Sequence, residues 1–482
     1  MTRVHSYSPD RRTAVVLSGT GAHGAYHAGV LRALQEAGVK IDLVAGHGIG
    51  AANAAVAAID GQARLWDVGG VWSSSEAAKL YEWRSSVRAT GWLVLVLSAV
   101  SIAPFVAVLA LGLVIYPLGF MLEMVGNGQG VAVIAAFSTW LQWAFFGPNL
   151  PTFVPRLGTF VFLALALLIL VAALTARRAE HRARRSRGAF WWRVLGAPID
   201  VDRARRMFAS TMWQLIRGAA PPGLPSLAAI GRRYADVLSE SLGQPGFREV
   251  VLIATDLDDK RDVVAALLRE PFGREFIAAR PNRDRRAEVL DLSDTGRDRA
   301  LDIVLAALTP PVGCDAQLVT FPPASVWRGE VHRLCDRPGI MSRLLEEVAA
   351  AGVTQAIVVT ATPSTSGPYQ LQSSWLDVRH RLGEFVVAAE SAAIRDALEM
   401  ARLRFDAVHV IRPVHNAVGP FDAGRTYDES SDRRIDVREL VERGAEDAYR
   451  QFIEPVVGAS GEHLARQIIA GSTGAGSEFA AS

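Results

Sequence analysis

The chain has 482 residues, half of them hydrophobic, and its 51 lysines and arginines nearly balance 49 aspartates and glutamates. A net charge of +2 excludes global electrostatic steering toward a polyanion, and two cysteines exclude a disulfide framework or a cysteine-rich metal site. The length alone allows roughly two or three structural units.

The beginning of the chain predicts strands and helices joined by glycine-rich turns. Short apolar runs bounded by glycines are typical of buried strands, and apolar residues at helical spacing indicate helices. In chain order we expect a strand over 13–17, a glycine-rich turn over 18–24, a helix over 25–37, a strand over 41–45 and a helix over 51–59.

The turn after the second strand has the frame of a nucleophile elbow, glycine-x-nucleophile-x-glycine. It reads Gly46-His47-Gly48-Ile49-Gly50. In such an elbow the flanking glycines let the backbone pass through a strained turn that presents one side chain at its tip. The tip residue here is Gly48, so the sequence predicts an acyl-transfer architecture that lacks the attacking atom.

The first glycine-rich turn is the candidate oxyanion hole. Its backbone N–H groups precede a helix N-terminus, whose dipole favours a developing negative charge. The candidate donors are Gly19, Thr20, Gly21, Ala22 and Gly24. The same turn also fits the glycine-x-glycine-x-x-glycine fingerprint of dinucleotide-binding folds. That fingerprint expects an acidic residue at the end of the second strand, where Gly46 stands, so a dinucleotide-binding membrane protein is the lesser alternative.

These segments resemble the patatin-like phospholipase family. Residues 17–31 are similar to its oxyanion loop and following helix, with Thr20 at a position that is usually glycine and His23 at one that is usually basic. Residues 50–55 match the small residues that follow the family's elbow, and residues 250–257 resemble one of its core strands.

The resemblance implies a patatin-like three-layer α/β sandwich with a mainly parallel central sheet. It also implies a serine–aspartate dyad, in which the aspartate takes the proton of the serine. The nearest counterpart of the aspartate motif is Asp336-Arg337-Pro338, where the family usually has small residues after the aspartate. Asp336 is therefore the candidate base, and Gly48 stands at the nucleophile position.

An almost uncharged stretch interrupts the family-like segments, with only two formal charges between residues 89 and 176. Residues 91–122 exceed the length of about 20 residues that crosses a bilayer, and residues 159–176 are a second candidate span. The tryptophans of residues 131–146 indicate an interfacial or re-entrant helix. Because strands of one sheet precede and follow the stretch, we expect two or four crossings, that is, a transmembrane helical hairpin or its doubled form. A buried hairpin in a soluble domain is the alternative.

Arginines flank this stretch, with six of them between Arg177 and Arg187. The positive-inside rule then predicts a protein of the inner membrane whose patatin-like part is cytoplasmic. The same arginines favour anionic headgroups, and a nucleic acid is set aside because the run adjoins a membrane span. Expected partners are therefore membrane phospholipids, without a cofactor or a metal, and the oligomeric state is left open.

The C-terminal half is α/β in pattern. Expected there are strands over 356–360 and 407–411, a long helix over 383–403 and a closing helix over 435–452. The predicted domains are the two parts of a patatin-like domain, 1–88 and 201–455, a transmembrane insertion, 89–176, a basic and aromatic segment, 177–200, and a tail, 456–482. The predicted function is a pseudoenzyme with a lipid-facing cleft that binds or senses membrane lipid. The alternative is an active lipid acyl hydrolase that uses water activated by Asp336 or another nucleophile.

Overall fold

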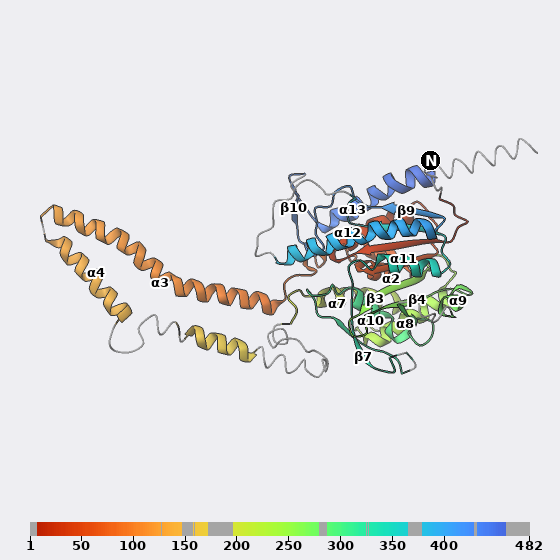
Figure 1. Cartoon of the computed structure of the whole chain (residues 1–482), viewed down its shortest axis with the longest axis horizontal. Helices are drawn as coiled ribbons and strands as arrows, with labels where there is room; N and C mark the ends of the chain where they lie inside the picture. The colour runs from red at the N-terminus through yellow and green to blue at the C-terminus, as the bar shows by residue number, and fades with distance from the viewer. Residues whose placement is uncertain are drawn as a thin grey trace, which may run out of the picture. The chain divides into compact units, whose positions relative to one another are not determined.

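The computed structural model describes residues 7–126, 128–146, 158, 160–171, 196–278, 287–323, 325, 327–364, 378–428 and 431–458. The chain divides into two compact units, residues 1–82 with 199–482, and residues 83–198. Figure 1 labels the helices and strands of both units.

The first unit is built on a nine-stranded sheet with the order β5-β4-β3-β2-β1-β8-β9, in which β7 pairs with β3 and β6 pairs with β7. Its strands are β1 Thr13–Gly19, β2 Leu43–Gly48, β3 Glu249–Asp256, β4 Arg261–Leu267, β5 Ala287–Asp291, β6 Gln317–Thr320, β7 Val331–Cys335, β8 Gln355–Thr360 and β9 Ala407–Ile411. The pairs β1–β2, β2–β3, β1–β8, β8–β9 and β4–β5 are parallel, whereas β3–β4, β3–β7 and β6–β7 are antiparallel. The expected α/β fold with a mainly parallel sheet is confirmed.

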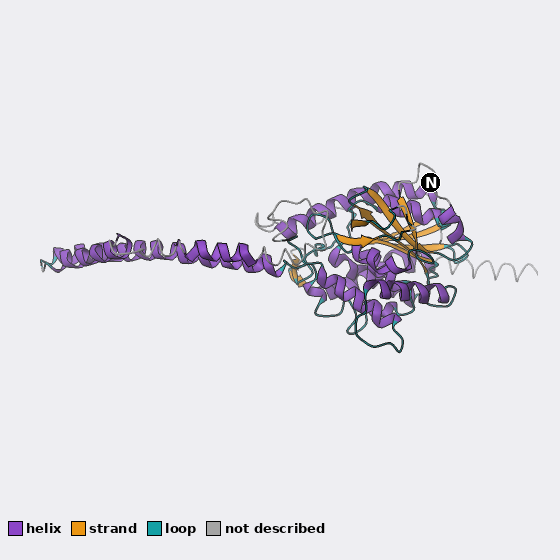
Figure 2. Cartoon of the chain, turned by 90° about the horizontal axis from the view of Figure 1, so that it is seen from below, coloured by secondary structure: helices purple, strands orange, loops and turns teal. Residues whose placement is uncertain are grey.

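Helices cover both faces of this sheet, as Figure 2 shows. The central strands β1, β2, β3 and β8 are buried throughout and mostly apolar, because a parallel sheet between two helical layers is buried on both faces. Successive residues of β1 alternate between two cores: Val15 and Leu17 lie in one, Ala14 and Val16 in the other. The first core receives α1 Gly24–Glu36, α2 Ile49–Ala57, α7 Asp202–Ile216, α8 Leu227–Ser241, α10 Ala300–Ala307 and α13 Val437–Ala448, and the second receives α9 Phe272–Ala278, α11 Met341–Ala350 and α12 Val378–Arg404.

Element boundaries differ from expectation where pairing or packing extends an element. β1 and β2 continue to Gly19 and Gly48, because these two glycines pair across the parallel ladder. The closing helix, expected over 435–452, consists of α13 and a π-helical segment, Tyr449–Gly458. α13 begins after Asp436, whose side chain accepts a hydrogen bond from the Arg438 N–H. A small antiparallel ribbon, β10 Thr426–Asp428 with β11 Arg433–Ile435, stands apart from the main sheet.

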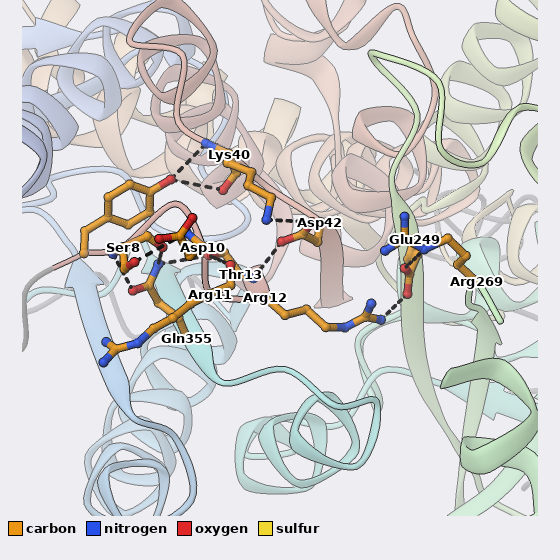
Figure 3. Close-up of polar contacts among 11 residues, drawn as sticks. Ser8, Asp10, Arg11, Arg12, Thr13, Lys40, Asp42, Glu249, Arg269 and Gln355 are labelled. Atoms are coloured by element: carbon orange, nitrogen blue, oxygen red, sulfur yellow. Dashed lines mark hydrogen bonds and ion pairs between the residues drawn. The ribbon is translucent and has the colours of Figure 1, made fainter. Parts of the chain in front are cut away.

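Polar contacts tie the amino ends of four strands together (Figure 3). Arg12, directly before β1, forms a buried ion pair with Glu249 at the start of β3. The Thr13 N–H donates to the Asp42 carboxylate at 2.9 Å, and the Gln355 amide donates to the Thr13 hydroxyl at 2.9 Å. Because these strands are parallel, their carboxyl ends, and with them the glycine-rich turns, lie together at the opposite edge of the sheet.

The second unit contains two packed helices, α3 Ser85–Met124 and α4 Gln129–Phe146. Among the described residues, one helical window is long and apolar enough to cross a membrane: Phe105–Met124, with a mean hydropathy of 2.4 and 6% of it buried. The first expected span, 91–122, therefore lies within a longer helix. Of the second, 159–176, the described part holds the shorter apolar helix Phe160–Val171. The arginines of 177–187 lie outside the described residues.

Candidate functional site

The elbow turn lies between β2 and α2 and has the expected sharp geometry. Its tip, Gly48, has φ 58° and ψ −137°, a conformation that is open essentially to glycine alone without strain. The flanking glycines are required by close backbone approach. A Cβ on Gly46 would lie 2.3 Å from the carbonyl oxygen of Gly50, and a Cβ on Gly50 would lie 2.3 Å from that of Leu17. The turn therefore depends on the two flanking glycines, and its tip conformation would strain any residue other than glycine.

The tip of the elbow has no room for a side chain. A Cβ on Gly48 would lie 2.3 Å from the carbonyl oxygen of Gly19 and 2.9 Å from Oδ2 of Asp336. The first atom belongs to the backbone, so it can move only if the glycine-rich loop moves. The structure thus brings the nucleophile position and the candidate base together, and it directs a carbonyl oxygen of the candidate oxyanion loop at the tip.

The rest of the candidate oxyanion loop is engaged with its own surroundings. The Ala22 N–H donates to the Pro420 carbonyl at 2.7 Å, and a Cβ on Gly21 would lie 1.8 Å from the same oxygen. The Gly24 N–H turns back to carbonyls within the loop, and a Cβ on Gly24 would lie 2.1 Å from the Trp72 ring. At least two of the five expected donors therefore already have protein acceptors.

Five polar side chains form a continuous chain of contacts beside the elbow, which we call the buried polar network. Ser18 Oγ lies 2.8 Å from His47 Nε2, and His47 Nδ1 lies 3.3 Å from Asp336 Oδ1. Thr20 Oγ1 lies 3.2 Å from Asp336 Oδ2 and 2.7 Å from Glu390 Oε1. All five side chains are 2% exposed or less.

Protonation within this network follows from burial and from the number of hydroxyl protons. Thr20 has one hydroxyl proton, so it donates to one carboxyl and accepts from the other, which must then be protonated. Burial raises the pKa of Glu390 to about 7, against the opposing effects of His47 and Thr20. Burial lowers the pKa of His47, but its hydrogen bond to Asp336 and the charge of Asp336 outweigh this, and the pKa is raised. Glu390 is thus the carboxyl that carries the proton.

Sequence reasoning missed two members of the network, Ser18 and Glu390. Glu390 lies on α12 one turn from Val386 and one turn from Ile394, which are both buried. A carboxylate on the apolar stripe of a helix was therefore the available signal. Ser18 stands opposite His47 in the parallel ladder, and that pairing is a property of the fold rather than of either segment.

A second polar cluster, Asp256, Asp258 and His332, brings possible metal ligands within 4.8 Å of one another. Each member already has a protein partner. His332 Nδ1 lies 2.5 Å from Asp256 Oδ2, and the Arg333 guanidinium donates to Asp258 at 2.8 Å. We therefore assign no metal to this cluster.

A sequence model of the family described as "Patatin-like phospholipase" matches residues 15–269, more than half of the chain. No curated protein matches the sequence at a significant level. Among solved structures, the chain is similar to VipD from Legionella pneumophila, with 11% identity over 93% of this chain and 68% of that chain, and a TM-score of 0.29. That score is too low to carry an argument. The family match shows that the chain belongs to the patatin-like phospholipase family.

Proposed function

We propose that this chain is a membrane-anchored patatin-like protein that binds membrane phospholipid and does not cleave it. The main observation behind this proposal is the glycine at position 48. Glycine removes the nucleophile, and the Gly19 carbonyl oxygen, 2.3 Å from where a Cβ would stand, removes the room for one. A dyad needs a hydroxyl for its aspartate to activate, so the family's reaction cannot begin at this turn.

The candidate base supports the same conclusion. Asp336 is 1% exposed, and its two carboxylate oxygens contact His47 and Thr20. A carboxylate whose two oxygens are both hydrogen-bonded inside the protein is poorly placed to take a proton from water or substrate. We therefore propose that Asp336 holds the elbow and the glycine-rich loop together rather than acting as a base.

The membrane part of the proposal rests on α3. Its window Phe105–Met124 leaves large apolar side chains uncovered, including Leu113 at 70% and Met124 at 76% exposure. Exposed apolar surface of this extent favours contact with lipid. We extend the proposal to the inner membrane, with the patatin-like unit on the cytoplasmic side and the arginines of 177–187 near anionic headgroups.

A second candidate is an active lipid acyl hydrolase whose nucleophile is Ser18. The contacts Ser18–His47, 2.8 Å, and His47–Asp336, 3.3 Å, have the order of a serine–histidine–aspartate triad. In that reaction Ser18 Oγ attacks the ester carbonyl, and His47 takes the hydroxyl proton and returns it to the leaving alcohol. This candidate is second because Ser18 is 0% exposed, so an ester reaches it only if the domain opens.

The test is fatty-acid release from mixed phospholipid vesicles by the full chain, together with flotation of the chain on the same vesicles. Ser18→Ala and Asp336→Asn, purified identically, control for contaminating lipases. The proposal expects flotation and no release from any of the three proteins. Release that is lost in Ser18→Ala would establish the second candidate. Release that is lost only in Asp336→Asn would establish water activated by that carboxylate, and a chain that does not float does not bind lipid.

A further inference from the structure

A pocket of about 140 Å³ lies at the carboxyl ends of β8 and β9, beside α12. Thr362 and Ser364 follow β8, Arg412 follows β9, and Ser391 and Arg395 stand one turn apart on α12. In parallel α/β sheets, ligands bind outside the carboxyl ends of strands, where the strand order reverses. Here the reversal falls between β1 and β8, and the pocket lies beside it, at the ends of β8 and β9.

The pocket gathers positive charge that the protein does not neutralise. Arg395 and Arg412 both line it, and neither pairs with a carboxylate in the described part of the chain. Near the end of the same helix, by contrast, Arg402 pairs with Glu399 at 2.9 Å. Two arginines on one pocket, without a nearby carboxylate to neutralise them, create a positive potential that attracts an anion. The lining therefore favours an anionic ligand.

An unsatisfied hydroxyl in the lining points to the same kind of ligand. Thr362 is 4% exposed, and its Oγ1 has no hydrogen-bond partner among the described residues. Its backbone N–H is already used, because it donates to the Thr360 hydroxyl at 3.2 Å. A buried hydroxyl without a partner is unfavourable, and turning the Thr362 side chain toward the pocket would let an oxygen of a ligand accept its proton.

We propose that this pocket binds a phosphate group. Its polar lining residues are two arginines, two serines and a threonine, so they offer many donors and no carboxylate. A phosphate has enough terminal oxygens to accept from both arginines and from a hydroxyl together, whereas a carboxylate has only two. The group belongs either to a lipid headgroup or to a free phosphate compound. The proposal does not depend on whether the elbow is active.

The test begins with isothermal titration of inorganic phosphate into the full chain in a zwitterionic detergent, with acetate as the comparison anion. The wild type is expected to bind phosphate, and Arg412→Gln, Arg395→Gln and Thr362→Val are each expected to weaken it, by roughly tenfold for either arginine. Arg381→Gln is the matched control: this arginine is exposed on the same helix, about 21 Å from Arg395 along its axis. Thr362→Val keeps the shape of the side chain, so its loss of binding cannot be attributed to misfolding.

Vesicles of phosphatidylcholine with and without phosphatidic acid then identify the source of the phosphate. Stronger capture by phosphatidic acid that falls in the Arg395/Arg412 double variant, but not in Arg381→Gln, assigns a headgroup. Phosphate binding in solution, with equal capture of wild type and double variant, assigns a free phosphate compound. Because the arginines of 177–187 are present in every variant, the result is the difference in vesicle capture between the wild type and each variant. Two titration results would overturn the proposal when the wild type and the double variant are also captured equally by the vesicles. In the first, the binding heat of phosphate is no larger than that of acetate. In the second, the binding heat of phosphate is the same in the pocket variants as in the wild type.

Discussion

Gly48 and Gly19 face each other at the carboxyl ends of two parallel strands, and their contact limits what can stand at the tip of the elbow. Gly48 takes φ 58°, and the Gly19 carbonyl occupies the space into which a side chain would project. The loop that carries this carbonyl is held by the hydrogen bond from Ala22 to Pro420. Replacing the residue at position 48 therefore does not by itself restore the surroundings that a serine needs.

We predict that Gly48→Ser does not restore fatty-acid release and lowers the free energy of unfolding by roughly 1–3 kcal/mol, from backbone strain alone. Urea denaturation and a vesicle release assay measure the two effects. Gly48→Ala is the matched control, because it adds the same Cβ without a hydroxyl and should lose as much stability. Release by Gly48→Ser at unchanged stability would show that the glycine-rich loop moves aside and that the Gly19 carbonyl is no barrier.

The helices α3 and α4 depend on glycine in a different way. A Cβ on Gly130 would lie 2.1 Å from the Gly119 carbonyl oxygen, so the two backbones are in direct contact at this point. In the membrane setting that we propose for α3 and α4, helices gain little from the hydrophobic effect, and small residues that allow close approach become the main source of packing. The Val131 N–H also donates to the Glu123 carboxylate at 3.3 Å, near the connection between the helices.

We expect Gly130→Ala to move α3 and α4 apart by about 1.5 Å, because an ordinary carbon contact needs about 3.5–4.0 Å. Spin labels at exposed positions of the two helices, Leu109 and Trp143, would report the change as a longer distance in pulsed electron resonance. Gly112→Ala serves as the control, since its Cβ would find its nearest neighbour at 3.8 Å. Equal distances in both variants would mean that the glycine contact does not set the spacing.

At the scale of the whole molecule, the sequence predicts the strands that are apolar on both faces. β1, β2, β8 and β9 could be expected from their short apolar runs, and β3 from its resemblance to a core strand of the family. The strands β4 to β7 were not predicted. β6 and β7 are short and partly exposed, and β7 is fixed by pairing with β3, about 80 residues away in sequence. Such pairing leaves no local pattern to detect.

The candidate site divides in the same way. The glycines of the elbow and Asp336 carry motif signals, whereas the direction of the Gly19 carbonyl does not, because glycine leaves its backbone dihedrals open. Glu390 reaches Thr20 across 370 residues of sequence, and only packing of α12 on the sheet brings them together. Most residues of the site could therefore be predicted from the sequence, whereas the long-range contacts between them could not.

Buried titratable groups make the stability of the domain depend on pH in two directions. Burial raises the pKa of Glu390 to about 7. Its contribution to the free energy of unfolding is therefore complete below its unfolded pKa of 4.5, declines as the pH rises, and is lost above pH 7. The pKa of His47 is also raised, so its contribution to the free energy of unfolding is lost as the pH rises above 6.5. Burial lowers the pKa of His23 to about 4 and of His27 to about 3, so their contribution is instead lost as the pH falls below 6.5.

Because these opposing contributions overlap, the test of Glu390 is a difference between variants. Glu390→Gln keeps the shape of the protonated carboxyl and cannot ionise. Its free energy of unfolding should exceed that of the wild type by no more than about 1 kcal/mol near pH 5 and by about 3 kcal/mol at pH 8, since each pKa unit is worth about 1.4 kcal/mol. Urea denaturation of the full chain at both values measures this, with the exposed Glu399→Gln as control. An equal difference at pH 5 and pH 8 would mean that Glu390 does not titrate between them, and the proton assigned to its contact with Thr20 would have to lie elsewhere in the network.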